Sequence, residues 1–248
     1  MMSDWIIGKH AVQEALKSGR EVEKIVFAEG VNKHSVQSII SDAKSKQIAF
    51  QWVPRTRLDQ LSEQGNHQGV IAQVAAYQYA TLDDLFREAE QKKEMPFFVI
   101  LDGIEDPHNL GSILRTADAA GVHGVIIPKR RAVGLTSVVA KTSAGAIEHV
   151  PVVRVTNLNR TVETLKTKGI WVLGTDGDAK ASYEKPQYDM PIALIIGNEG
   201  KGISQQLKKK CDFLVRIPMK GKISSLNASV AAGVLMYQIF LNGRKSHG

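Results

Sequence analysis

Short runs of Val, Ile and Leu alternate along the chain with segments in which apolar residues recur every three or four positions. The apolar runs predict β-strands at residues 24–28, 49–53, 69–75, 97–101, 124–127, 151–155, 170–174, 192–196 and 213–217. The segments with helical spacing predict α-helices at residues 10–18, 34–46, 57–63, 109–120, 159–168, 204–209 and 226–241. Because strands alternate with helices, the pattern favours an α/β fold with a mostly parallel sheet that helices cover on both faces.

One polar segment divides this pattern into two parts. Residues 77–95 contain an acidic run followed by a basic run, between the apolar stretches 70–76 and 97–101. We therefore predict a small N-terminal α/β domain at residues 1–76, a linker at 77–95 with a short helix from Leu82 to about Lys92, and a larger α/β domain at residues 96–248. The sequence has no internal repeat and no low-complexity tract.

The composition is that of an ordinary globular protein, with 248 residues, 43% hydrophobic and 23% charged. No apolar run approaches the roughly 20 residues of a membrane-spanning helix. The first residues lack the basic and apolar regions of a signal peptide. Cys211 is the single cysteine, so an internal disulfide is excluded, as is typical of a reducing compartment. We expect a soluble cytoplasmic protein with no membrane partner.

The positive charge is concentrated in the larger predicted domain. Residues 1–76 carry 9 basic and 8 acidic side chains, whereas residues 96–248 carry 20 basic and 12 acidic ones. Such an excess favours a polyanionic partner, because Lys and Arg bind phosphates and release counterions. A charged surface that only maintains solubility is an equally good explanation, so charge alone does not establish nucleic-acid binding.

In a parallel sheet, ligands bind at the carboxyl ends of the strands, which here precede residues 102–109, 197–202 and 218–227. The second of these loops reads G-N-E-G-K-G, which matches neither a P-loop nor a dinucleotide-binding fingerprint. The sequence also lacks the G-x-S-x-G motif of hydrolases and the H-E-x-x-H motif of zinc proteases. The histidines have no metal-ligand spacing, so no metal site is expected.

Each loop allows a structural and a functional interpretation. The glycines at 197–202 allow close backbone approach, either to a flat polar ligand or within a tight turn. Asn109 is a good helix N-cap, and Ser225 or Asn227 could cap the last helix. Glu199 is either a contact for a helix N-terminus or a ligand or dimer contact. Arg115 interrupts an apolar helix within two turns of Asn109, which favours a role in a pocket over simple solvation.

Together, these loops resemble the SpoU (TrmH-type) family of RNA ribose 2′-O-methyltransferases in the knotted SPOUT superfamily. The three family motifs correspond to N-L-G-S-I-L-R-T-A at 109–117, I-I-G-N-E-G-K-G-I at 195–203 and I-P-M-K-G-K-I-S-S-L-N-A-S-V-A at 217–231. The segments I-I-G-K-H-A-V-Q-E-A-L at 6–16 and H-Q-G-V at 67–70 resemble the substrate-binding extension of the subgroup that methylates a guanosine in the peptidyl-transferase region of 23S rRNA. That extension is itself similar to small RNA-binding ribosomal proteins.

The resemblance implies a fold, a cofactor and a set of site residues. The C-terminal domain would end in a trefoil knot, an exception to the rule that chains avoid knots. S-adenosylmethionine would bind in the knot, held by the backbone around three residues: Gly197, Ile217 and Leu226. The catalytic neighbourhood would consist of Arg115, Asn109, Glu199, Ser225 and Asn227. The resemblance also implies a homodimer with the site at its interface, where Arg115 acts either within its own chain or across it.

The implied activity is methylation of a ribose 2′-hydroxyl in RNA, with 23S rRNA as the first candidate substrate and no DNA partner. Arg115 would position the phosphate of the target nucleotide and activate the hydroxyl, because a guanidinium stays protonated and suits this role better than that of a base. Two alternatives concern the substrate: a tRNA guanosine or an rRNA adenosine. An alternative of another class is a non-catalytic RNA-binding or ribosome-assembly protein.

Overall fold

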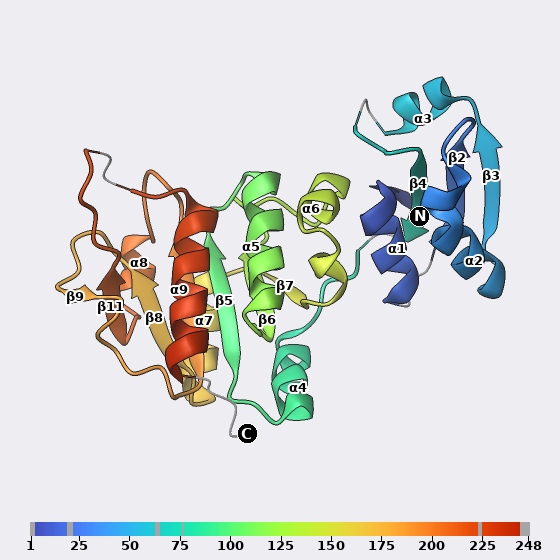
Figure 1. Ribbon diagram of the computed structural model, residues 1–248. Helices are drawn as coiled ribbons and strands as arrows, with labels where there is room; N and C mark the ends of the chain where they lie inside the picture. Colours follow the sequence, from blue (N-terminus) through green and yellow to red (C-terminus); the bar gives the residue numbers. More distant parts are fainter. Residues whose placement is uncertain (1–2, 19–21, 63–64, 76, 223–224, 244–248) are drawn as a thin grey trace. The chain divides into compact units, whose positions relative to one another are not determined.

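The computed structural model describes residues 3–18, 22–62, 65–75, 77–222 and 225–243 (Figure 1). The chain forms two compact units. The smaller unit contains residues 1–78 and 135–149, and the larger unit contains residues 79–134 and 150–248. No helix in the described ranges is long and apolar enough to cross a membrane.

A four-stranded sheet forms the centre of the smaller unit, in the order β1-β4-β2-β3. The strands are β1 (Ser3–Ile7), β2 (Val22–Ala28), β3 (Ala49–Val53) and β4 (Val70–Ala75). The helices are α1 (Lys9–Lys17), α2 (Gln37–Ser45), α3 (Arg55–Leu61) and α6 (Ser137–Thr142), with 3-10 helices at Lys33–Val36 and Ala146–Glu148. Since β2 is parallel to β3, and β4 is antiparallel to both β1 and β2, the strands β1, β2 and β3 all run in one direction.

Helices cover both faces of this sheet, as the alternation of side chains along β2 requires. Ile25 and Phe27 are fully buried in one apolar cluster with residues of α1 and α2. Val26 and Ala28 are buried in a second cluster with Leu58 of α3. Burial on both faces explains why β2 reads as a continuous apolar run in the sequence.

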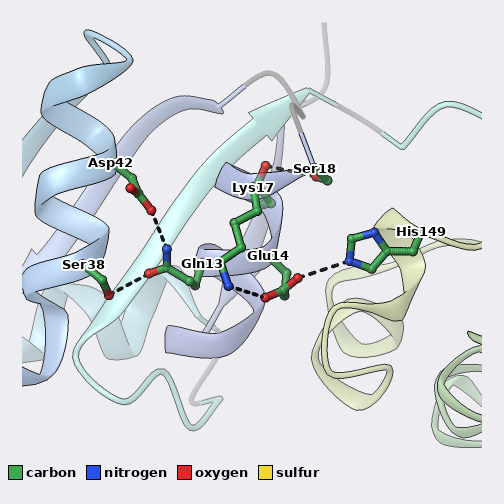
Figure 2. A network of polar contacts seen from close by, with 8 residues as sticks. Gln13, Glu14, Lys17, Ser18, Ser38, Asp42 and His149 are labelled. Carbon is green, nitrogen blue, oxygen red and sulfur yellow. Dashed lines mark hydrogen bonds and ion pairs between the residues drawn. The ribbon is translucent and has the colours of Figure 1, made fainter. Parts of the chain in front are cut away.

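Polar contacts on α1 join three helical segments of the smaller unit (Figure 2). Glu14 forms an ion pair with Lys17 one turn later and contacts Nε2 of His149 at 3.2 Å. The hydrogen bond with His149 is the largest cause that lowers the pKa of Glu14 below its usual value. Gln13 is hydrogen-bonded to Ser38 and Asp42 of α2.

The larger unit contains a seven-stranded parallel sheet in the order β7-β6-β5-β10-β8-β11-β9. The strands are β5 (Phe97–Asp102), β6 (Gly124–Pro128), β7 (Val152–Val155), β8 (Trp171–Thr175), β9 (Ala181–Ser182), β10 (Ile192–Gly197) and β11 (Phe213–Arg216). The helices are α4 (Leu82–Lys92), α5 (Pro107–Ala119), α7 (Leu158–Thr167), α8 (Gln205–Lys208) and α9 (Ala228–Gly243).

Helices cover both faces of this sheet as well. Phe98 and Ile100 of β5 point to one face, where they join a buried cluster with residues of α4, α7 and α8. The other face carries α5 and α9, which pack against each other, with α9 in contact with β10 and α5 with β6. Figure 1 shows both helices beside β5. The parallel sheet of the larger unit, with helices on both faces, confirms the predicted α/β class, whereas the sheet of the smaller unit is mixed, with one parallel and two antiparallel pairings.

The division into units differs from the predicted one in two places. Residues 79–95 belong to the larger unit, because α4 buries Leu85 and Ala89 against its core. The short helix predicted in this segment is α4, and its polar composition is that of an amphipathic helix; the domain boundaries and the linker stay predictions. Residues 135–149 group with the smaller unit, where α6 packs against β1. The trefoil knot stays a prediction.

Candidate active site

The three predicted ligand loops meet at the carboxyl edge of the seven-stranded sheet. Asn198, directly after β10, donates from Nδ2 to the carbonyl oxygen of Gly103 after β5, at 3.1 Å. Asp102 at the end of β5 accepts a hydrogen bond from the backbone N–H of Ser204 at 2.8 Å. The third loop joins them through Asn227, so the expected convergence is confirmed by contacts between segments about a hundred residues apart.

Glu199 is the centre of a hydrogen-bonded cluster in these loops. Its Oε1 accepts from Asn227 Nδ2 at 2.6 Å, from Asn109 Nδ2 at 3.1 Å and from the backbone N–H of Ala228 at 3.1 Å. Asn227 Nδ2 also lies 3.0 Å from Asn109 Oδ1. Three of the five residues predicted to be catalytic therefore form one group, in which a carboxylate is placed at the N-terminus of α9.

Asn227 also caps the N-terminus of α9, as its position before this helix suggests. Its Oδ1 accepts hydrogen bonds from the backbone N–H groups of Ser229 at 2.9 Å and Val230 at 3.3 Å. It therefore caps α9 with its oxygen while its amide nitrogen donates to Glu199. The helix start and the cluster are thus held by opposite ends of one side chain.

The residue type of Asn109 suggests that it is the N-cap of α5, but the structure places another residue there. Asp106 is the cap, accepting from the backbone N–H of His108 at 2.7 Å, and Pro107 occupies the first helical position. Asp is a strong cap and Pro is favoured at the first position, so the N-cap lies three residues before Asn109 and the helix begins two residues before it. The side chain of Asn109 is thereby free to contact Glu199.

A cavity of about 480 Å³ lies beside this cluster. This volume is within the range of small-molecule sites. Gly197, Ile217 and Leu226, the three residues expected to hold a cofactor, all line it, as do Glu199 and Ser225. The end of β8 and the residues after it, 175–178, form another part of the wall, which sequence reasoning missed.

The missed part of the wall includes an ion pair between Asp176 and Lys208. Their side chains are 2.8 Å apart and each is only 18% exposed. The hydrogen bond from Lys208 holds the pKa of Asp176 below its usual value. The available signal was the T-D-G-D sequence directly after a buried strand, at the same carboxyl edge as the other loops.

The loop after β10 closes tightly at Gly197. The backbone N–H of Gly202 donates to the carbonyl oxygen of Asn198 at 2.7 Å, which folds the loop back on the end of the strand. A Cβ atom on residue 197 would lie 2.1 Å from the carbonyl carbon of Gly202. Glycine at this position is therefore required by the turn itself, in addition to any contact with a ligand.

Arg115 lies outside the cluster. Its side chain is exposed on α5, is not part of the cavity wall, and has no ion pair with any residue in the described part of the chain. Ser225 is exposed and lines the cavity. Residues 223–224, in the middle of the third motif, lie outside the described residues.

The described side chains support neither a metal site nor a cysteine nucleophile. Over the described ranges, no three His, Cys, Asp or Glu side chains come together in a way that could hold a metal ion. Burial raises the pKa of Cys211 to about 11, so its thiol is protonated near neutral pH and is a poor nucleophile.

Comparison with known proteins finds two families along the chain. The SpoU rRNA methylase family matches residues 96–237. A second family, described as RNA 2′-O ribose methyltransferase substrate binding, matches residues 5–80. The chain is also 60% identical over 237 residues to the Bacillus subtilis protein YacO, which is assigned to the TrmH family of tRNA/rRNA methyltransferases. That alignment covers 96% of this chain and 95% of YacO.

Solved structures resemble both units. The SpoU methyltransferase AviRb from Streptomyces viridochromogenes, in complex with the cofactor AdoMet, aligns with a TM-score of 0.80 and 25% identity. The alignment covers 96% of this chain and 90% of AviRb. A crystal structure of an RNA 2′-O ribose methyltransferase aligns with a TM-score of 0.77 and 26% identity, covering 96% of this chain and 88% of that one.

Proposed function

The chain belongs to the SpoU family of RNA methyltransferases, and we propose that it transfers a methyl group from S-adenosylmethionine to a ribose 2′-hydroxyl of RNA. The observation that carries this proposal is the placement of the predicted residues: Gly197, Ile217 and Leu226 line one cavity beside the cluster of Glu199, Asn109 and Asn227. The match of residues 5–80 to a substrate-binding family of ribose 2′-O-methyltransferases supports the ribose as the target.

The residues of the cavity fit S-adenosylmethionine. Its wall contains three glycines of the loop after β10, at positions 197, 200 and 202, which expose backbone groups to a flat polar ligand. It also contains charged groups of both signs: Asp176 is paired with Lys208, which leaves Asp178 for a ligand with an ammonium and a sulfonium charge, while Lys201 and Arg216 suit the carboxylate of the same ligand. When bound, this cofactor supplies an activated methyl group on a good leaving group, so the protein's part is to position the acceptor hydroxyl.

The cluster at Glu199 is arranged to give that positioning. Because Asn109 and Asn227 are held by the same carboxylate oxygen, the starts of α5 and α9 cannot shift independently. We assign Ser225, exposed in the cavity wall, and Asn227 to orienting the nucleotide. Arg115 is assigned to the phosphate of that nucleotide and to stabilising charge on the attacking oxygen, for which a protonated, planar guanidinium is suited.

Arg115 lies outside the cavity wall of its own chain, so the proposal includes a homodimer in which Arg115 reaches the active site of the partner subunit. The exposed face of α9 repeats apolar residues at Val230, Val234, Tyr237 and Leu241, a spacing that places them along one side of the helix. Leu241 is 56% exposed and Val230 51%. Since α5 packs beside α9 and Arg115 is exposed on α5, we propose that a partner subunit covering this face meets Arg115.

We propose 23S rRNA as the substrate, with a guanosine in its peptidyl-transferase region as the target nucleotide, in the cytoplasm. Support comes from the substrate-binding family that matches the smaller unit and from the basic excess of the larger one. In addition, Lys129, Arg130 and Arg131 are exposed directly after β6, at the same edge of the sheet as the cavity. We assign these cations to the backbone phosphates of an RNA that reaches the cavity.

The test is to incubate the full chain with labelled S-adenosylmethionine and separated 23S rRNA, 16S rRNA and tRNA, and then to map the labelled nucleotide. Label in 23S rRNA that resists alkaline cleavage at a guanosine supports the proposal, because a 2′-O-methyl group blocks that cleavage. Label in tRNA alone, or on an adenosine, would replace the substrate but keep the reaction. No label in any RNA, with normal RNA binding, would favour a non-catalytic protein.

A further inference from the structure

The carboxyl ends of β1, β2 and β3 lie at one edge of the small unit's sheet, because these strands run in the same direction. The chain therefore presents three loops there: residues 8–10 after β1, 29–35 after β2, and 54–57 after β3, where α3 begins (Figure 1). Residues 65–69 join them, since β4 is antiparallel and starts at this edge. None of these loops has a role in the larger unit's site.

Two of the sequence motifs meet at this edge, although they are about sixty residues apart. The backbone N–H of Gly8 donates to the carbonyl oxygen of Val70 at 3.1 Å. The backbone N–H of Lys9, at the start of α1, donates to Oε1 of Gln68 at 3.3 Å. Gln68 adopts a φ of 52°, which is unfavourable for a residue with a side chain. The two motifs thus form one structural feature, with backbone strain at its centre.

A buried histidine fixes this feature. His67 is 2% exposed, and its Nδ1 accepts the backbone N–H of Gly69 at 2.9 Å. Since Nδ1 is an acceptor, Nε2 carries the proton and donates to Oδ1 of Asp59, also at 2.9 Å. Asp59 lies on α3, so the histidine ties the loop before β4 to the helix after β3.

The loops so held carry exposed cations. Lys33, Arg55 and Arg57 are exposed, and Lys9 is half-buried. None of these four forms an ion pair with a carboxylate of the described residues: Lys9 donates to Ser35 Oγ, and Arg57 to Gln60 Oε1. We name Lys9, Lys33, Arg55 and Arg57 the cationic edge.

Carboxylates do not neutralise the cationic edge. The acidic residues in these loops and on α3 are Glu29 and Asp59, and Asp59 already accepts from His67. Four of the nine basic residues of positions 1–76 are therefore gathered at one end of a unit that is nearly neutral overall. A local excess of this kind on rigid loops is typical of a phosphate-binding surface.

We propose that the cationic edge binds the phosphate backbone of the RNA substrate. This inference rests on the proposed function, and it deepens it by naming where the smaller unit contacts RNA. His67 and Gln68 act as positioning residues that hold the loops, whereas Lys33, Arg55 and Arg57 contact phosphates directly. Phosphate contacts carry no base information, so this surface contributes affinity and orientation rather than base recognition.

The experiment compares two triple variants of the full chain. One replaces Lys33, Arg55 and Arg57 by Gln. The other replaces Lys17, Lys44 and Lys46 by Gln; these lie at or just after the C-terminal ends of α1 and α2, at the opposite end of the same unit. Binding of a labelled 23S rRNA fragment is measured over a range of salt concentrations, beside the affinity for S-adenosylmethionine. For the edge variant we expect RNA affinity to fall on the order of 10- to 100-fold at ~0.1 M salt, and the slope of log K against log salt to fall by about 2.

The control variant should keep nearly the wild-type slope, and both variants should bind S-adenosylmethionine as the wild type does. A third variant with Lys33→Arg, Arg55→Lys and Arg57→Lys keeps the charge and should keep the slope, which separates electrostatics from folding. Equal loss of RNA affinity in the edge and control variants would overturn the inference, as would an unchanged slope in the edge variant. If the edge variant binds naked RNA normally and loses only its binding to a ribosomal particle, the edge binds protein instead and the inference is wrong. A wild type that binds RNA with a normal slope but never methylates it would refute the proposed function and leave this inference standing.

Discussion

Gly197→Ala tests the geometry of the candidate cofactor site with the smallest available change. The added methyl group would lie 2.1 Å from the carbonyl carbon of Gly202, 2.3 Å from the backbone nitrogen of Ile203 and 2.4 Å from the carbonyl oxygen of Gly202. All three are backbone atoms, so no side-chain rotation relieves the contact. The loop must move away from the end of β10.

The size of the movement follows from these distances. Ordinary contacts of a Cβ atom begin at 3.4 Å, so the shortest one must lengthen from 2.1 Å by about 1.3 Å. That displacement breaks the hydrogen bond from Gly202 to Asn198, which contributes about 1 kcal/mol, and overpacking adds about 1–3 kcal/mol. We therefore expect the free energy of unfolding of the larger unit to fall by about 2–4 kcal/mol.

The effect on function should be larger than the effect on stability, because Glu199 lies in the displaced loop. A misplacement of about 1 Å at a site can cost on the order of 100-fold in rate. We expect S-adenosylmethionine affinity and single-turnover methylation each to fall on the order of 100-fold at a temperature where the variant is still folded. Calorimetry, rapid-quench kinetics and thermal unfolding measure the three quantities.

Gly200→Ala is the matched comparison in the same loop. Its Cβ would meet nothing closer than the side-chain oxygen of Asn198 at 3.7 Å, an ordinary contact. Its effect on stability should therefore be well below that of Gly197→Ala, at about 1 kcal/mol or less in either direction. Equal unfolding curves for the two variants, or normal cofactor affinity in Gly197→Ala, would refute the reasoning from close backbone approach.

Three further tests, at Arg115, on α9 and at Asp176, address other parts of the proposal. Arg115→Ala should lower the methylation rate by about 10²–10³-fold with unchanged cofactor affinity, and Arg115→Lys should restore little; near-normal rates in single-turnover assays would contradict this. Replacing Tyr237 and Leu241 together by Glu should convert a dimer into a monomer in sedimentation at micromolar concentration, whereas an unchanged sedimentation coefficient would exclude this face as the interface. For Asp176→Asn, the stability advantage of the wild type should be constant above about pH 5 and disappear as the pH falls below the ordinary carboxyl value of 3.8. The reason is that the pKa of Asp176 is lower in the folded state; a difference that persists at low pH, or grows, in urea unfolding would contradict it.

Local patterns predicted most of the elements, because strands buried on both faces leave continuous apolar runs. The predicted strand at 192–196 is β10, Ile192–Gly197, and the predicted helix at 82–92 is α4. The strand β1 was missed, because five residues of mixed polarity beside the chain start do not distinguish a strand from a loop. What could not be read locally was the core against which each segment packs: the sequence shows a helix at 82–92 but not that its Leu85 is buried in the larger unit.

The site was predicted in part for a similar reason. Loops at the carboxyl ends of parallel strands must meet, and this rule alone brings Asn109, Glu199 and Asn227 to one edge. Their hydrogen bonds depend on side-chain directions that spacing does not give. The cap of α5 is an example: the competition between Asp106 and Asn109 is decided by Pro107, which fits the first helical position.

The polar residues of this protein fall into two groups: those whose charge is satisfied by other residues of the chain, and cations that form no ion pair with the described residues. Around the cavity, Glu199 is satisfied by two asparagines and a helix start, and Asp176 by Lys208, so these side chains are committed to holding the protein's own loops. Arg115 and the cationic edge have no carboxylate partner in the described part of the chain. A long cation that is not held in an ion pair keeps more side-chain freedom, and a polyanion can bind it without first breaking an ion pair. The committed residues therefore set the geometry of the cofactor and the target hydroxyl, whereas the uncommitted cations in both units are the ones that an RNA backbone can recruit.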